Sequence, residues 1–515
     1  MSKNTHFLYK THKELLINEE VAGRSLSVLV DEIKNLYLAD NRPWIIGFSG
    51  GKDSTTILSL IYSALLDLSP EARNKHVFVV SSDTLVETPV VVDMINRVRE
   101  VINKQGQIDQ LPISAHSVYP KIDQTFWVNL LGRGYPAPQQ SFRWCTERMK
   151  IDPVSSFITD KVAQFGEVIV VLGSRTQESA SRAQVIANHA IEGSLLNRHS
   201  SLPNAYTYMP IKDWSADEVW LYLMGAPCPW GDDNQGFGDN RELFDLYKGS
   251  NQGECPLVID KSTPSCGNSR FGCWTCTVVT EDRALHGLIE SGMKWMKPLL
   301  DFRNKIHKST DPELKREYRN YKRRTGKVSY MQGDISDDTN KELKHIPGPY
   351  WLEVRKKWVK ELLLIEKSLK EGGHPFPLIR LEELQAIRQE WLRDPNEPDW
   401  ADSLPRIYSE VYEDEVEWIE NDAGAFTEPD AILLKELGEK HNVPAELIMK
   451  LIEVELSVSG LGKRHGIMQK LENVLKRDWE SLKDINIRNM STSNGGVWKE
   501  KIKQLQHSYD EAPTV

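Results

Sequence analysis

An apolar segment followed at once by a glycine turn constrains this chain more than any other feature. Residues Trp44–Phe48 have the character of a short buried strand, the turn Ser49-Gly50-Gly51 follows, and helical character begins straight after it. A strand–turn–helix corner of this kind directs backbone N–H groups and the positive end of a helix dipole at one point. We therefore expect an anion-binding loop here, with an ordinary structural corner as the alternative.

The side chains of this turn are suited to phosphate. Glycines let the backbone approach a ligand closely, and serine hydroxyls add hydrogen bonds. Lys52 supplies positive charge, and Asp53 can hold Mg²⁺ that is already bound to phosphate oxygens. A Walker A loop would need glycine in place of Ile46 and Ser or Thr in place of Asp53, so this is a different phosphate loop. The candidate ATP- and pyrophosphate-binding residues are Ser49, Gly50, Gly51, Lys52, Asp53 and Ser54.

The length and composition of the chain predict several domains. It has 515 residues, of which 40% are hydrophobic, so two or three domains with proper cores are expected. Without a run of about 18 apolar residues or a signal-like N-terminal segment, we expect a soluble, cytoplasmic protein that does not contact membranes. The predicted segments are an N-terminal helical segment 1–40, a nucleotide-binding domain 41–231, a cysteine-rich region 232–298 and a helical C-terminal region 299–515.

Apolar strand candidates alternate with helical stretches through the first half of the chain. Such alternation predicts the α/β class, with a parallel sheet covered by helices on both faces, and ligands bind at the carboxyl ends of such strands. The helical stretches between the early strands are 55–68 and 90–103. The strand candidates are 44–48, 76–81, 111–116, 168–172 and 206–211.

The second strand candidate ends in a polar pair, Asp83 and Thr84. A carboxylate and a hydroxyl at this position can reach the ribose or base of a nucleotide, so we predict that both contact it. The nearby Thr88-Pro89 pair also suits a helix N-cap followed by its first residue.

A single cysteine, Cys145, is flanked by three cationic residues, Arg143, Arg148 and Lys150. Positive charge nearby lowers the pKa of a thiol, and the thiolate is the form that accepts or passes on sulfur. The alternative is a small buried hydrophobic residue. We predict that Cys145 is the catalytic cysteine.

Four further cysteines crowd into 22 positions, with spacings of ten, six and two residues between them. In a cytoplasmic enzyme such crowding indicates metal binding or catalysis before disulfides. Four thiolates suit either a [4Fe–4S] cluster or structural zinc. Zinc sites usually combine two close pairs, so the spacing favours the cluster, and the predicted ligands are Cys255, Cys266, Cys273 and Cys276.

The loop from Ser49 to Ser54 resembles the pyrophosphate-binding loop of the ATP pyrophosphatase (PP-loop, adenine-nucleotide α-hydrolase) superfamily. Members cleave ATP between its α and β phosphates or bind a related adenylyl sulfur compound. The segments 173–182 and 208–220 resemble the phosphoadenylyl-sulfate reductase branch of that superfamily. This resemblance implies that Gly173, Arg175 and Arg182 contact the nucleotide or its phosphates.

Some reductases of that branch have two adjacent cysteines where this chain has Trp144-Cys145. This departure leaves Cys145 available for a catalytic role. Taken together, the loop, Cys145, the four-cysteine group and the long C-terminal extension resemble the sulfurtransferase family of the DNA phosphorothioation (Dnd) system.

That resemblance implies an ATP-dependent sulfurtransferase that activates a DNA backbone phosphate, releasing pyrophosphate, and inserts sulfur. It further implies ATP, Mg²⁺ and a [4Fe–4S] cluster as cofactors. The implied partners are DNA, a cysteine desulfurase as sulfur donor and other subunits of the system. The alternatives are a reductase of adenylyl sulfate or phosphoadenylyl sulfate and a non-catalytic nucleotide-binding scaffold.

The charge of the chain is unevenly distributed. The net charge is −10, yet residues 302–330 contain ten Lys or Arg and three Asp or Glu. A basic segment on an acidic protein is compatible with a polyanion at one face, so 302–330 is a candidate DNA contact. A solvated helix face is the alternative.

Overall fold

The structure is a computed structural model of the whole chain, and it divides into two compact units. Unit 1 contains residues 1–126, 138–307 and 368–378, and unit 2 contains residues 127–137, 308–367 and 379–515. The predicted four-segment division is finer than these two units. The described residues are 20–21, 23–178, 180–226, 228–231, 240–250, 272–330, 345–414, 416–419, 428–456 and 466–492.

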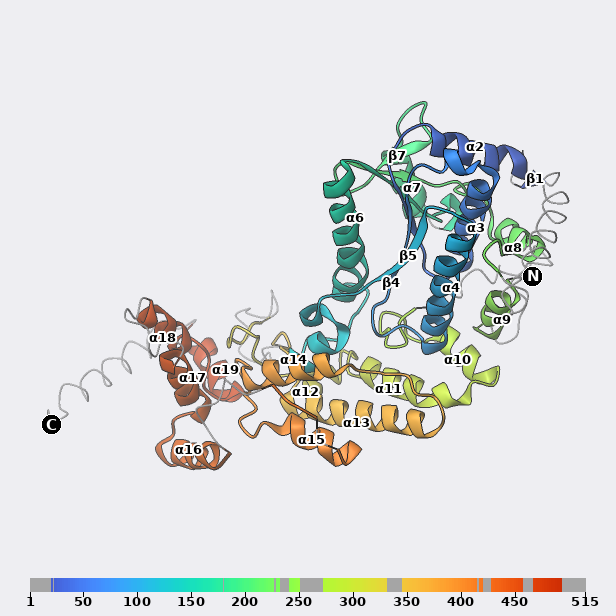
Figure 1. Cartoon of the computed structure of the whole chain (residues 1–515). Helices are drawn as coiled ribbons and strands as arrows, with labels where there is room; N and C mark the ends of the chain where they lie inside the picture. Colours follow the sequence, from blue (N-terminus) through green and yellow to red (C-terminus); the bar gives the residue numbers. More distant parts are fainter. Residues whose placement is uncertain are drawn as a thin grey trace. The chain divides into compact units, whose positions relative to one another are not determined.

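Unit 1 is built on a six-stranded sheet (Figure 1). The strands in spatial order are β5 (Ile113–Val118), β4 (Val77–Ser82), β3 (Trp44–Gly47), β6 (Val168–Val171), β8 (Ala205–Tyr208) and β7 (Leu196–Arg198). All pairings are parallel except that of β7 with β8. The five predicted strands are confirmed, while β7 was not predicted because only three residues form it.

Helices cover both faces of this sheet, as the α/β prediction required. On one face α2 (Leu26–Leu38), α3 (Lys52–Asp67), α4 (Pro89–Ile108) and α8 (Ala216–Gly225) pack against Trp44, Ile46, Val77, Val79, Ile169 and Val171. On the other face α6 (Asp152–Phe165) packs against Ile45, Phe78, Val80, Val168 and Val170. The alternation of these strand side chains between two buried faces explains why the strands are almost wholly apolar.

The N-terminal segment is only partly helical. Among the described residues before α2, Glu20–Val21 and Arg24–Ser25 form a short antiparallel pair, β1 and β2. The expectation of helix over the whole of 1–40 is therefore wrong at these residues, and residues 1–19 lie outside the described part. The turn between the two strands contains Gly23, whose φ of +72° favours glycine.

The remaining helices of unit 1 follow the sheet or connect its strands. They are α5 (Trp144–Thr146), α7 (Ala180–Asn188), α9 (Arg241–Ser250), α10 (Arg283–Glu290) and most of α11 (Lys297–Lys308). The α9 and α10 helices cross closely, because a Cβ on Gly287 would lie 2.6 Å from the carbonyl oxygen of Ser250.

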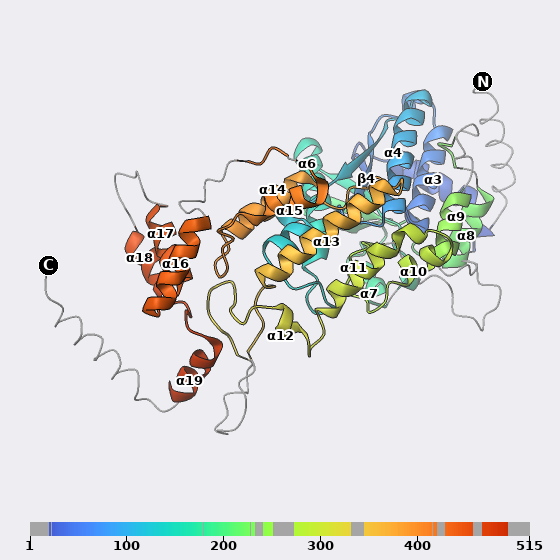
Figure 2. The ribbon, with the colours of Figure 1, turned by 90° about the horizontal axis from the view of Figure 1, so that it is seen from below.

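The described part of unit 2 is helical, as predicted. Its helices are α12 (Lys315–Tyr318), α13 (Leu352–Glu371, up to residue 367), α14 (Leu381–Leu392), α15 (Ser403–Tyr412), α16 (Glu428–His441), α17 (Ala445–Leu456), α18 (Ile467–Leu475) and α19 (Leu482–Thr492). Figure 2 shows α13 beside α14 and α15, and a buried ion pair of 2.8 Å joins Arg355 of α13 to Asp394. None of the described helices is long and apolar enough to cross a membrane.

Candidate active site

The predicted phosphate loop lies between β3 and α3, at the carboxyl end of the central strands. Gly50 has a φ of +70°, and a Cβ at this position would lie 2.6 Å from the side chain of Ile95. Glycine is therefore required here both by the backbone conformation and by the close approach of α4. Gly51 is the N-cap of α3, so the first N–H groups of that helix face the loop.

The two serines of the loop bind one another rather than pointing away from the loop. The Ser54 hydroxyl donates to the Gly51 carbonyl at 3.0 Å, and the Ser49 N–H donates to the Ser54 hydroxyl at 3.2 Å. The two hydroxyl oxygens lie 3.2 Å apart. These contacts fix the shape of the loop before any ligand arrives, a structural role that the sequence did not indicate.

Asp53 lies between two cations. Its carboxylate accepts a hydrogen bond from the Arg175 guanidinium at 2.7 Å and one from the Lys52 ammonium at 3.2 Å. Arg175 is almost fully buried and also donates to the Trp214 carbonyl at 3.2 Å. Asp53 therefore balances the charges that are expected to bind phosphate.

The structure brings Gly173 to the same place. A Cβ on Gly173 would lie 3.0 Å from the backbone carbon of Asp53, so glycine permits the close contact between the end of β6 and the start of α3. Gly173 and Arg175 are thus placed with the loop. Arg182 lies in α7, and its side chain lies outside the described part of the structure.

Tyr247, on α9, is a residue of this site that sequence reasoning missed. The Lys52 N–H donates to the Tyr247 hydroxyl at 3.3 Å, and the Lys52 ammonium lies 5.5 Å from the centre of the tyrosine ring. A Cβ on Gly51 would lie 3.2 Å from the same hydroxyl. Lys52 and Tyr247 are 195 residues apart in the sequence, so no local pattern indicated this contact.

Asp83 and Thr84 do not share one role. The Asp83 carboxylate accepts a hydrogen bond from the Leu85 N–H at 2.8 Å, a turn contact that accompanies the left-handed conformation of Leu85. Thr84 is fully buried, and its hydroxyl lies 3.0 Å from the Glu87 carboxylate and 3.4 Å from the Cys273 sulfur. The Thr84 side chain therefore contacts the cysteine loop, whereas the sequence predicted a contact with the nucleotide.

The cysteine loop, Gly272–Thr280, is attached to the residues that follow β4. Glu87 and Cys273 form an isolated antiparallel bridge, and the Trp274 N–H donates to the Val86 carbonyl at 3.0 Å. Thr88 is the N-cap of α4 with Pro89 after it, as expected, but its hydroxyl donates to the Gly272 carbonyl at 3.0 Å. The segment after β4 thus carries the cysteine loop as well as starting a helix.

Arg303 holds the other side of this loop. Its guanidinium donates to the carbonyls of Cys276 at 2.8 Å and Thr280 at 2.9 Å, and also to that of Val279. The residue is completely buried. The predicted basic segment 302–330 is therefore not a single DNA-facing strip, because Arg303 stabilises the cysteine loop.

Cys145 lies in α5 with Cys276 and Lys150 close enough to affect its ionisation. Burial raises the pKa of the Cys145 thiol above its ordinary value, and Cys276 raises it further, while Lys150 lowers it. The expectation of a lowered pKa is wrong, because burial outweighs the effect of the lysine. The structure thus brings Cys145 together with Cys276, which the sequence had treated separately.

The Lys150 side chain also forms an ion pair with Glu87. Its ammonium pairs with the Glu87 carboxylate at 3.1 Å, and the negative charges of Cys273 and Glu87 raise its pKa. The Cys273 thiol donates to Glu87 at 3.7 Å, and burial together with Glu87 raises the pKa of that thiol. Glu87 therefore contacts both the Lys150 ammonium and the Cys273 sulfur.

The cysteine loop has part of the chemistry that a metal cluster needs. Cys273 and Cys276 lie on one turn, closed by a hydrogen bond of 3.0 Å from the Cys276 N–H to the Cys273 carbonyl. The four described cysteines form no disulfide. No three His, Cys, Asp or Glu side chains of the described ranges already form a metal-binding group, and the predicted ligands Cys255 and Cys266 lie outside those ranges.

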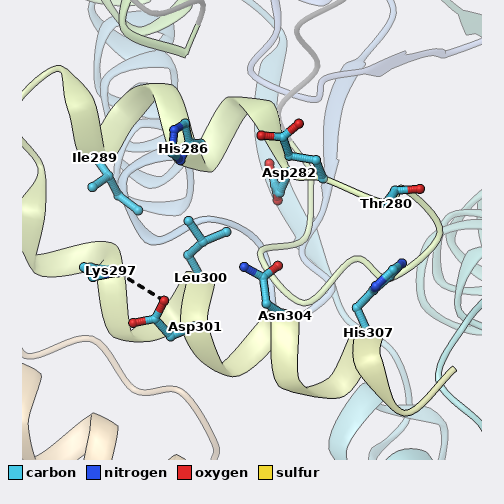
Figure 3. A pocket seen from close by; sticks show the side chains of 10 residues that line it. Thr280, Asp282, His286, Ile289, Lys297, Leu300, Asp301, Asn304 and His307 are labelled. Atoms are coloured by element: carbon cyan, nitrogen blue, oxygen red, sulfur yellow. Dashed lines mark hydrogen bonds and ion pairs between the residues drawn. The ribbon is translucent and has the colours of Figure 1, made fainter. Parts of the chain in front are cut away.

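A separate cavity of about 540 Å³ lies between α10 and α11 (Figure 3). Its polar side chains have partners within their own helices: Asp282 caps α10 through the Leu285 N–H, and Lys297 pairs with Asp301 at 3.3 Å. We therefore assign no ligand to this cavity.

The sequence of the sheet and cysteine loop matches a known domain family. Residues 43–278 match the profile of the phosphoadenosine phosphosulfate reductase domain. This part of the chain is therefore similar to that reductase domain, and the rest of the chain lies outside the match.

Curated relatives match over the same limited region. An uncharacterised protein of Methanocaldococcus jannaschii is 28% identical over 213 residues, which cover 41% of this chain and 38% of that protein. The chain spans less than two fifths of the length of the curated relatives it matches.

Solved structures give weaker likenesses. A phosphoadenylyl-sulfate reductase from Candida auris is 14% identical, with a TM-score of 0.28, over 53% of this chain and 96% of that one. A U34-tRNA thiolase from Methanococcus maripaludis with its [4Fe–4S] cluster is 14% identical, with a TM-score of 0.25, over 44% of this chain and 74% of that one. Scores of this size do not establish a shared arrangement of whole chains.

Proposed function

We propose that this chain is an ATP-dependent sulfurtransferase that forms phosphorothioate DNA, like the protein C family of the Dnd system. One observation carries the proposal: the segment after β4 contacts the cysteine loop, and the helix that it starts, α4, packs closely against Gly50 of the predicted phosphate loop. Thr84 and Glu87, in that segment, contact Cys273 directly. A site that combines ATP activation with thiol chemistry suits sulfur insertion into an activated acceptor.

The first step uses the loop and its cations. The N–H groups at the start of α3 bind the β and γ phosphates. Lys52 and Arg175 exchange their hydrogen bonds to Asp53 for hydrogen bonds to the phosphate oxygens. The Asp53 carboxylate would hold Mg²⁺, which would neutralise part of the phosphate charge. A non-bridging oxygen of the DNA phosphate attacks the α phosphorus, and pyrophosphate leaves.

The second step replaces the activated oxygen by sulfur. Cys145 carries a persulfide received from a cysteine desulfurase, and its terminal sulfur attacks the adenylylated DNA phosphorus while AMP leaves. An external thiol reductant then cleaves the sulfur–sulfur bond, which releases the phosphorothioate and restores the Cys145 thiol.

We further propose that Cys255, Cys266, Cys273 and Cys276 hold a [4Fe–4S] cluster, which supplies electron transfer or an ordered sulfur site. DNA, the cysteine desulfurase and other subunits of the system are proposed partners. The exposed Lys and Arg side chains of 308–327 are the candidate DNA contacts that remain, because Arg303 is buried.

The decisive test is phosphorothioate formation by a Cys145→Ser variant. The variant is expected to lose phosphorothioate, detected by mass spectrometry of digested DNA, while it still releases pyrophosphate from Mg-ATP. Cys228→Ser is the matched control, since Cys228 donates to Asn240 and is not among the clustered cysteines. Normal phosphorothioate levels with Cys145→Ser would reject the sulfur carrier, and absence of pyrophosphate release by the unaltered chain would favour a scaffold.

A reductase of adenylyl sulfate or phosphoadenylyl sulfate is the second candidate, because the domain match over residues 43–278 favours it. This activity releases sulfite from the nucleotide and does not require ATP cleavage. Incubation with each nucleotide and a thiol reductant separates the two candidates: sulfite production would support the reductase, and its absence together with pyrophosphate release would support the sulfurtransferase.

A further inference from the structure

The cysteine loop contains a buried hydroxyl without a hydrogen-bond partner. Thr275 lies between Cys273 and Cys276 and is 0% exposed, and its Oγ1 atom contacts no donor or acceptor among the described residues. A buried hydroxyl without a partner destabilises the fold, so it needs an explanation, such as a bound water, a bound ion or a redox role.

Hydrogen bonds from other parts of the chain hold the backbone on both sides of Thr275. Trp274, which is also buried, bonds to Val86 on one side, and Arg303 bonds to the Cys276 carbonyl on the other. The neighbouring Thr277 shows what an ordinary buried threonine does here, since its hydroxyl donates to the Pro138 carbonyl at 2.7 Å.

We infer that the Thr275 hydroxyl donates a hydrogen bond to a sulfur atom of the group that Cys273 and Cys276 hold. This inference rests on the cluster included in the proposed function. Sulfur atoms of an iron–sulfur cluster become more negative on reduction, so a donor stabilises the reduced form and raises the reduction potential. Thr275 is thus a positioning residue that sets the potential of the cluster.

The test compares Thr275→Val, which removes only the hydroxyl, with Thr275→Ser, which retains it. Thr277→Val is the matched control in the same loop. Each full-length chain is purified anaerobically, analysed for iron and acid-labile sulfide, and titrated between its oxidised and reduced forms by visible and electron paramagnetic resonance spectroscopy. The expected result is a more negative potential for Thr275→Val, with Thr275→Ser and Thr277→Val equal to the unaltered chain.

The metal-free chain gives a second readout that needs no cluster. Valine replaces an unpaired hydroxyl at 275 but a paired one at 277, so Thr275→Val is expected to raise the melting temperature of the metal-free chain and Thr277→Val to lower it. In the chain that contains the cluster, Thr275→Val is not expected to raise the melting temperature, because the Thr275 hydroxyl of the unaltered chain then has a hydrogen-bond partner.

The outcomes separate the inference from the proposed function. A colourless unaltered chain, or one that contains zinc, overturns the cluster and the inference with it. A loaded chain in which Thr275→Val leaves the potential unchanged overturns the inference alone. If Thr275→Val does not bind iron, its potential cannot be measured. A normal iron content of Thr275→Ser then supports the hydrogen bond from the residue 275 hydroxyl to sulfur, and loss of iron from both variants overturns it.

Discussion

The phosphate loop and the cysteine loop lie on the same sheet, yet they acquire their shapes in different ways. The phosphate loop is closed by contacts among neighbours, such as Ser54 with Gly51 and Ser49. The cysteine loop is held by residues far away in the chain, namely the segment after β4 and Arg303. The sequence therefore showed the motif of each loop, but it did not show the distant residues that hold the cysteine loop in place.

Arg303→Leu tests whether the cysteine loop depends on its long-range supports, and it has the largest expected effect on stability. The carbonyls of Cys276, Val279 and Thr280 lose their charged donor, and a hydrogen bond to a charged group is worth about 1.5–3 kcal/mol. We therefore expect a loss of about 3 kcal/mol or more in the free energy of unfolding, measured in urea, with loss of bound iron. Mg-ATP affinity is expected to change little, because the phosphate loop has its own local contacts.

Arg283→Leu is the control for that experiment, since this arginine is 89% exposed and its replacement should change stability by less than about 0.5 kcal/mol. Equal losses of nucleotide binding and iron in Arg303→Leu would contradict the independence of the two loops.

Gly50→Ala tests the phosphate loop in the same way. A side chain at a φ of +70° costs about 1–2 kcal/mol, and the clash with Ile95 adds to it. We expect a loss of about 2–3 kcal/mol in stability and loss of Mg-ATP binding measured by calorimetry, with bound iron retained.

Gly193→Ala isolates the conformational part of that effect. Gly193 has a φ of +72°, and a Cβ added there would have no other atom within 4 Å. An equal loss of stability in both variants would show that the Ile95 contact contributes nothing.

The reactivity of the Cys145 thiol at different pH values tests the effect of burial near the cysteine loop. Its thiol pKa is raised by burial, so at pH 7 less thiolate is present than in an unfolded chain. We expect iodoacetamide to modify Cys145 of the metal-free chain more slowly at pH 7 than in denaturant, as followed by mass spectrometry. The rate should rise as the pH increases toward the raised pKa, and a faster rate at pH 7 than in denaturant would contradict the effect of burial.

Tyr247→Phe has the smallest expected effect. It removes one neutral hydrogen bond to the Lys52 N–H, worth about 0.5–1.5 kcal/mol, and leaves the ring beneath the Lys52 ammonium. The expected result is a change of about two- to tenfold in the dissociation constant for Mg-ATP. Tyr222→Phe is the control, because that hydroxyl pairs with Ser59 along α3 and not with the loop; an equal change there would show that the effect is not specific to the loop.

The sequence predicted the sheet well because each strand is a short apolar run and each turn carries its own signal. Helix boundaries were predicted less well where a single residue decides them. Within the region 299–515, which the sequence predicted to be helical, the chain turns at Asn442, which has a φ of +55°, and at Pro444, so that α16 and α17 form separately. The site followed the same pattern: the glycines of the loop were identified, but Tyr247 and Arg303 were not.

The sequence by itself determined the α/β class, the glycine turn between a strand and a helix, and the presence of a cysteine group, because each depends on residues that are neighbours in the chain. Only the tertiary structure decided that Thr84 contacts Cys273, that Cys145 lies near Cys276, and that burial raises the pKa of the Cys145 thiol. The physical reason is that hydrogen bonds and desolvation depend on distances in space. A sequence shows which charges are adjacent along the chain, but burial determines how strongly they act.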